Sequence, residues 1–137
     1  MKKTDELFKI LKSSHDIDGF LDGQEFIEIN IPDYLNRLIE KKGFTKADII
    51  KRSGIDRVYG YQILNGTKTP SRDKLIQIAF GMRLDINEVQ KLLKYNGFAA
   101  LYAQNRRDSI IIFAVKEKLT VIELNILLDE KSEKILD

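Results

Sequence analysis

Apolar residues recur three and four positions apart along most of this chain, which is the spacing that places them on one face of an α-helix. Alternating apolar and polar residues occur at Phe26–Ile31, and we interpret this stretch as an extended lead into the next helix because no second strand pattern is present to pair with it. The sequence therefore predicts an all-α fold. Its helices are expected near residues 3–12, 32–42, 45–53, 56–64, 71–81, 85–95, 106–118 and 120–128.

Start and stop signals bound most of these helices. Polar side chains that can accept a hydrogen bond from the first backbone N–H groups precede five of them, at Thr45, Asp56, Ser71, Asp85 and Thr120. A glutamate follows each of the last two after three residues, which predicts capping boxes, and Thr45 with Asp48 makes an approximate one. Glycines at positions 43, 54, 66, 81 and 97 stand where helices are expected to end, because glycine adopts a left-handed backbone conformation at little steric cost.

The most informative pattern lies in residues 45–70, where two short helical stretches are joined by a tight turn at Ser53-Gly54. This arrangement predicts a helix-turn-helix. A second helix held across the first can project its outer face into the major groove of DNA, which is wide enough to admit one helix. The same pattern also fits a plain helical hairpin that does not bind DNA, and both interpretations stay open at this point.

Charge is distributed unevenly, although the net charge of the chain is only +2. Residues 41–74 hold nine basic residues against three acidic ones, a net of +6, whereas residues 1–33 hold four lysines against eight acidic residues, a net of −4. Clustered cations attract phosphate groups, and they also form ordinary solvated surfaces. The acidic N-terminal segment can contact a protein partner or cover the basic region.

Several functional classes find no support in the residues. The chain has no cysteine and a single histidine, His15, so no metal site is expected, and the stretch that follows it lacks the spacing of a calcium-binding loop. We find no phosphate-binding glycine loop and no nucleophile with a base, and so expect neither an enzyme nor a cofactor. The longest apolar run, Ile110–Val115, is far shorter than the roughly 20 residues that span a bilayer. With no secretion signal at the N-terminus, the expected location is the cytoplasm.

The order of helices between Tyr34 and Tyr95 resembles the Xre or lambda-repressor-like (Cro-type) family of DNA-binding domains. That resemblance implies a compact five-helix bundle and covers about 60 residues. It is carried by Thr45-Lys46 at the start of the second helix, Gly54 in the turn, Ile55 and Ile63 in the core, Asn65-Gly66 after the recognition helix, Pro70-Ser71, and Leu84–Glu88.

The resemblance also implies a set of DNA-contacting residues. Arg57, Val58 and Gln62 match positions that face base edges, while Lys46 and Asn65 match positions that contact backbone phosphates. Arginine can bind guanine and glutamine can bind adenine through paired hydrogen bonds, and valine can touch a thymine methyl group. Nearby cations and hydroxyls can add further phosphate contacts, and these are Lys51, Arg52, Lys68 and Thr69. Each of these side chains can equally be an ordinary surface residue.

The chain departs from the family pattern in two places. Ile50 stands where a small residue is usual, and Gly60 stands where a branched apolar residue is usual. Because these positions meet in the family fold, we expect Ile50 to fill the space left by Gly60. Tyr59 and Tyr61 flank that glycine, and aromatic residues on an exposed helix surface also suit a protein interface. The alternative function is therefore a protein-interaction adaptor or antitoxin-like module without DNA binding.

These observations predict three parts. Residues 1–31 form an acidic N-terminal helical arm, residues 32–97 the helix-turn-helix domain, and residues 98–137 a C-terminal helical extension. Ile110–Val115 is apolar on every face of a helix, so it belongs either in the core or at a subunit interface. We place the contact of a homodimer in the pair between Arg106 and Leu128, and expect a regulator that binds double-stranded DNA without membrane association.

Overall fold

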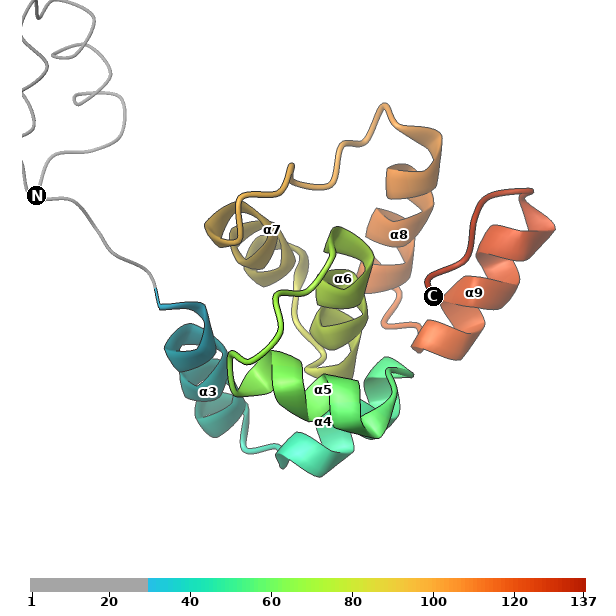
Figure 1. The fold of residues 1–137 in the computed structure, drawn as a ribbon. Helices are drawn as coiled ribbons and strands as arrows, with labels where there is room; N and C mark the ends of the chain where they lie inside the picture. Colours follow the sequence, from blue (N-terminus) through green and yellow to red (C-terminus); the bar gives the residue numbers. More distant parts are fainter. Residues whose placement is uncertain (1–29) are drawn as a thin grey trace, which may run out of the picture.

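The computed structural model describes residues 30–137, and every helix or strand assigned within that range is an α-helix. The helices are α3 (Ile31–Lys42), α4 (Lys46–Ser53), α5 (Arg57–Leu64), α6 (Arg72–Gly81), α7 (Ile86–Tyr95), α8 (Arg106–Lys116) and α9 (Val121–Glu130) (Figure 1). The all-α prediction is confirmed for this range. Its seven helices are two more than a five-helix bundle contains, the additional two being α8 and α9. The helix expected at residues 3–12 and most of the extended lead lie outside the described residues.

The predicted caps account for where the helices begin. Side-chain oxygens of Thr45, Asp56 and Ser71 each accept a hydrogen bond from the backbone N–H three residues later. Capping boxes are formed at the starts of α7 and α9, whereas at the start of α4 only the bond from Asp48 N–H to the Thr45 side chain is present. The cap of α3 was not predicted: Asn30 accepts from the backbone N–H of Asp33 at 3.1 Å. Local side-chain chemistry thus sets the first residue of each of these helices.

Helix α6 ends at Gly81 as predicted, but not because this glycine is left-handed. Gly81 is still helical, and the left-handed residue is Arg83, with φ of 53°. Gly81 lies where α6 crosses α4, and a Cβ atom there would be 2.5 Å from the carbonyl oxygen of Ile49. The close approach of two backbones therefore requires this glycine. Two other helix ends differ from the prediction: α8 ends at Lys116 instead of Lys118, and α9 ends at Glu130 instead of Leu128.

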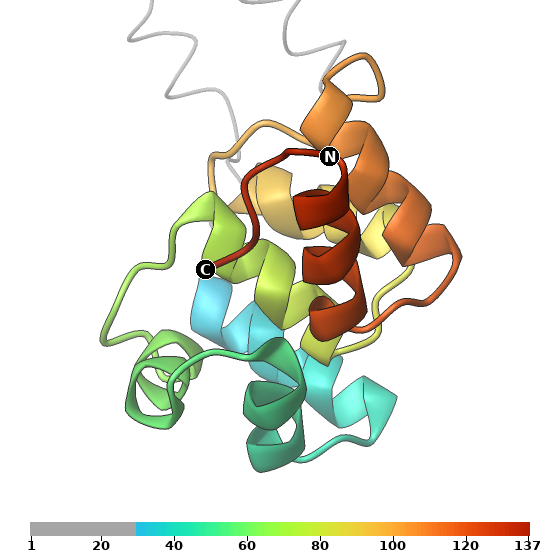
Figure 2. The same cartoon turned by 90° about the vertical axis from the view of Figure 1, so that its right-hand side faces the viewer.

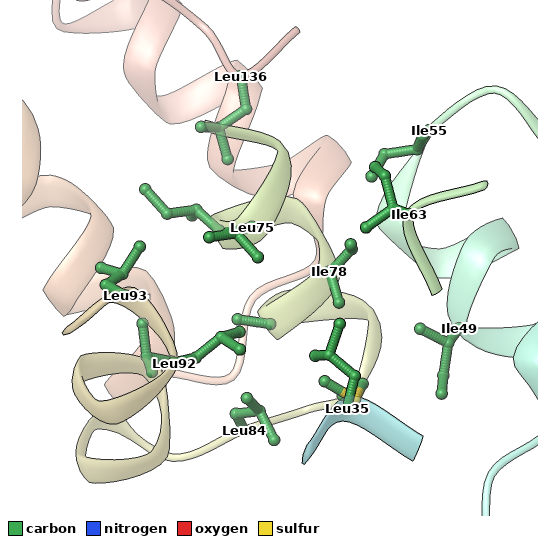
Figure 3. Close-up of a cluster of buried hydrophobic side chains, with 14 of the residues drawn as sticks. Leu35, Ile49, Ile55, Ile63, Leu75, Ile78, Leu84, Leu92, Leu93 and Leu136 are labelled. Carbon is green, nitrogen blue, oxygen red and sulfur yellow. The ribbon is translucent and has the colours of Figure 1, made fainter. Parts of the chain in front are cut away.

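One hydrophobic core joins the described helices. Helix α6 is central to it, with Leu75 and Ile76 fully buried and with contacts to α4, α7 and α9. Side chains from both ends of the described chain, including Leu35 and Leu136, belong to the same cluster (Figure 3). The C-terminal residues consequently share their buried surface with the helix-turn-helix region, instead of forming a core of their own.

The C-terminal pair packs on the rest of the bundle. Helix α8 contacts α7, and α9 contacts both α8 and α6, as Figure 2 shows from the side of α9. Ile111 and Ala114 enter the core, while Phe113 remains 49% exposed. The following tail is held by Asn125, whose side-chain amide makes paired hydrogen bonds of 2.7 and 2.9 Å with the backbone of Leu136.

Among residues 30–137, none of the helices combines the length and the apolar character needed to cross a membrane.

Candidate nucleic-acid interface

The turn between α4 and α5 is held by groups from three helices. Gly54 adopts a left-handed conformation with φ of 72°, as the sequence predicted. The hydroxyl of Ser53 donates to the carbonyl of Ile50 at 2.7 Å, and the buried amide of Gln77 on α6 donates to the carbonyl of Ser53 at 3.2 Å. Val121 at the start of α9 also borders Gly54. These contacts fix the direction in which α5 leaves the turn.

Helix α5 is buried on one face and open on the other. Gly60, Ile63 and Leu64 are buried. On the opposite face Arg57 is exposed and Val58 has 65% of its surface accessible. These exposed residues lie on a helix that is held at its first turn. Their side chains therefore form a defined surface, which side chains on a mobile loop would not.

Gly60 and Ile50 meet, as expected from the two departures of the sequence. A Cβ atom at Gly60 would lie 2.8 Å from Cγ2 and 2.9 Å from Cγ1 of Ile50. Such distances are shorter than carbon atoms tolerate, so the isoleucine side chain occupies the volume that a larger residue at position 60 would need. This packing brings α5 close to α4 and explains a glycine within an eight-residue helix.

The three residues implied to contact bases lie on the outward side of α5. Arg57 is the first residue of the helix and is exposed, Val58 follows it, and Gln62 is half-buried. Val58 and Gln62 are four positions apart, which places their side chains one above the other on the same face. Asp56, which lies beside this face, is the N-cap of α5 and accepts from Tyr59 N–H at 3.2 Å.

Most of the expected phosphate contacts lie in α4 or in the loop after α5, and they are exposed. Lys46 is the first residue of α4, and Lys51 lies in its last turn. Asn65, Lys68 and Thr69 are in the loop between α5 and α6, where all three are exposed. The oxygen of the Asn65 side chain accepts from the N–H and hydroxyl of Thr67, at 3.0 and 2.6 Å. Its amide nitrogen is the part suited to donate to a phosphate oxygen.

Arg52 differs from the other cations because it is turned into the protein. Its Nε donates to the carbonyl oxygen of Gly81 at 2.9 Å, and its guanidinium lies 4.4 Å from the ring centre of Phe44. Burial, with a smaller effect from the charge of Arg83, lowers the pKa of this guanidinium below its usual value. Arg52 therefore joins α4 to α6 in the described structure.

Two further cations of the basic region are paired with acids outside it. Lys42 binds Glu88 at 2.9 Å, and Arg72 binds Asp108 through two hydrogen bonds of 3.0 and 2.8 Å. Burial alone would raise the pKa of the Asp108 carboxyl, but hydrogen bonds from Arg72 and Tyr102 N–H, together with the charges of Arg72 and Arg107, lower it. These pairs neutralise two cations of the basic region, whereas Arg57, Lys51 and Lys68 take part in no ion pair with any of residues 30–137.

Tyr59 and Tyr61 are less available than the sequence suggested. Both are half-buried and pack against the core cluster. Their position weakens the argument for an exposed aromatic surface, on which the protein-interaction alternative was based.

One positioning contact gave no signal in the sequence. Asn36 of α3 donates from its side-chain amide to the carbonyl of Leu64, 28 residues away, at 3.3 Å. Pro32, also in α3, lies against Gly66. These contacts place the start of α3 beside the loop that carries Lys68. Pairings between residues so distant in sequence have no local pattern from which they can be predicted.

Among the described residues, no cluster of acidic or histidine side chains is suited to hold a metal ion.

Comparisons of the chain with known protein families, with curated proteins and with solved structures find no match in any of the three.

Proposed function

We propose that this protein is a sequence-specific DNA-binding regulator of transcription that inserts α5 into the major groove. The observation that carries the proposal is the outward face of α5, where Arg57 and Val58 are exposed beside Gln62 on a helix fixed by its turn. Lys51, in the last turn of α4, and Lys68, in the loop after α5, are also exposed. Cations at the edges and hydrogen-bonding side chains at the centre form the arrangement that reads base edges while binding the backbone.

Within this proposal, α3–α7 form the lambda-repressor-like unit and α5 is its recognition helix. Arg57 donates to guanine, Gln62 forms paired hydrogen bonds with adenine, and Val58 contacts a thymine methyl group. Lys46, Lys51, Asn65, Lys68 and Thr69 bind phosphates and fix the register of the helix. Function then follows from occupancy of DNA, with no chemical step and no cofactor, and the site of action is cytoplasmic.

The DNA-bound form is proposed to be a homodimer. Two recognition helices about one helical turn of DNA apart multiply the affinity of a single domain. The C-terminal pair carries exposed apolar side chains suited to a subunit contact, namely Phe113, Ile122 and Ile126, with 49%, 74% and 56% of their surfaces accessible. Sedimentation of the full chain with and without duplex DNA measures this state directly.

The decisive experiment is selection of binding duplexes from a random pool, followed by fluorescence anisotropy titrations. The double variant Arg57→Ala/Gln62→Ala is compared with a matched variant, Lys131→Ala/Gln104→Ala, which removes one cation and one amide from exposed positions away from α5. The first variant is expected to lose at least about tenfold in affinity for the selected duplex, because each paired contact to a base contributes about 1–3 kcal/mol. Circular dichroism melts establish that both variants are folded.

The outcomes separate the proposals. Equal losses in the two variants, or no preference of the wild type for the selected duplex over a scrambled one, would reject base recognition by α5. Failure to bind any duplex at low salt would reject DNA binding altogether, and a protein partner of the same face would become the hypothesis to test.

A further inference from the structure

The described chain begins beside the proposed DNA-binding face. Asn30 caps α3, whose first turn lies against the loop after α5 through the contact of Pro32 with Gly66. Asn36, one turn further on, binds the carbonyl of Leu64 at the C-terminal end of α5. Figure 1 shows this end of α5 next to α3. Asn30, the first described residue, therefore lies at the end of α3 that packs against the loop carrying Lys68.

The preceding segment is opposite in charge to that face. Residues 16–29 contain five acidic residues and no basic one. These are Asp16, Asp18, Asp22, Glu25 and Glu28, interleaved with apolar residues such as Phe20 and Phe26. The face itself carries exposed cations around the exposed apolar side chain of Val58. The acidic side chains of the segment thus have cations opposite them on the face, and the apolar side chains have Val58.

The segment is also long enough. A helix of eight residues such as α5 is about 12 Å long, and about four residues of extended chain cover that length. Residues 16–29 can therefore run from the loop after α5 to the start of the helix and still leave the more N-terminal residues outside the contact.

We propose that residues 16–29 dock on the outward face of α5 and compete there with the phosphates of DNA. The docking follows from charge and position alone, whereas its effect on DNA rests on the proposed function. Every duplex must then displace the carboxylates, so the segment lowers the affinity for all duplexes by the same factor. A duplex that also satisfies Arg57 and Gln62 still binds more tightly than one that contacts the phosphates alone.

The docking is tested without DNA, on the full chain, with a zero-length cross-linker that joins carboxylates to amines. Peptide mass spectrometry is expected to find Glu25 or Glu28 joined to Lys68 or Lys51 at low salt, and to find these links lost at high salt. Lys131, at the end of α9 on the side of the bundle opposite α3, is the internal control (Figures 1 and 2). Mixing chains of two isotopic compositions shows whether a link lies within one chain. Links to Lys131 as frequent as links to Lys68 and Lys51, or no links to either, would overturn the docking.

The effect on DNA is tested with two full-length variants of equal charge. One removes acids from the segment through Asp18→Ser, Asp22→Ser, Glu25→Gln and Glu28→Gln. The other removes four exposed acids from the C-terminal region through Glu117→Gln, Asp129→Asn, Glu130→Gln and Asp137→Asn. The first is expected to bind a random duplex about tenfold more tightly than the wild type, with a steeper dependence on salt, and the second to change much less.

The results distinguish the two proposals. Intramolecular links to α5-side lysines without DNA binding by any variant would retain the docking and reject the proposed function. DNA binding that both variants strengthen equally would show an effect of net charge only, and would reject competition by the segment.

Discussion

The outward face of α5 and the seam between α6 and α8 are both rich in cations, but they use them differently. In the seam, Arg72 and Arg107 each bind one carboxylate through two hydrogen bonds, to Asp108 and Asp73 respectively, at 2.8–3.0 Å. On the face of α5, the exposed Arg57 takes part in no ion pair with any of residues 30–137.

This difference separates structural charge from charge available to a ligand. A paired arginine has already exchanged water for a carboxylate, so it stabilises the fold and offers little to a phosphate. An exposed, unpaired cation contributes little to stability and retains its full attraction for an anion. Net charge in a stretch of sequence therefore overstates what a surface can bind, since Lys42 and Arg72 belong to the basic region but are neutralised by distant acids.

The largest effect is expected from breaking the seam. Asp108→Ala leaves the partly buried Arg72 guanidinium and the N–H of Tyr102 without their acceptor, and should lower the free energy of unfolding by about 3 kcal/mol. Urea denaturation measures the loss. Affinity for DNA, measured under conditions where the variant is folded, should be unchanged. A variant as stable as the wild type would show that the seam is not a structural element.

The next effect concerns the packing that supports α5. Gly60→Ile should overpack against Ile50 and destabilise the protein by about 1–3 kcal/mol, and adding Ile50→Ala should recover part of that loss because the added and removed volumes are similar. Thermal melts of both single variants and the double variant form a double-mutant cycle. If the double variant is no more stable than Gly60→Ile, the two side chains do not compete for the same space.

Acid should weaken the seam in a way that depends on Asp108. Its lowered pKa means that the folded chain takes up this proton less readily than the unfolded chain. The stabilisation is therefore complete above the ordinary carboxyl pKa, near pH 4, and is lost as the pH falls through the lower pKa of the folded state. The difference in unfolding free energy between wild type and Asp108→Asn should shrink as the pH falls below about 4. A difference independent of pH would contradict this assignment.

The smallest effect is expected at a single phosphate contact. Lys68→Gln should weaken binding to specific and random duplexes alike, and should reduce the slope of log affinity against log salt by about 1. Its stability should equal that of the wild type, because Lys68 is exposed. Lys131→Gln, an exposed lysine on the far side of the bundle, is the control and should leave the slope unchanged. Equal slopes for both variants would remove Lys68 from the interface.

Much of the local structure could be predicted because its causes are local. Helix starts are set by hydrogen bonds that span three residues. Examples are the cap at Ser71 and the capping boxes of Asp85 with Glu88 and of Thr120 with Glu123. The outward position of Arg57 and Val58 was implied by the family resemblance and not by the spacing of apolar residues, and both side chains are exposed. The role of Gly81 could not be predicted in this way, because it depends on how closely α4 crosses α6.

The sequence by itself determined the helices, their caps and the composition of the α5 surface, since these depend on residues within one or two turns of each other. Only the tertiary structure decided which cations are free, that Arg52 turns inward to Gly81, and that α8 and α9 share the core of the helix-turn-helix region. Those outcomes depend on pairing between residues tens of positions apart, whose free energy comes from burial and from contacts made only when the chain has folded.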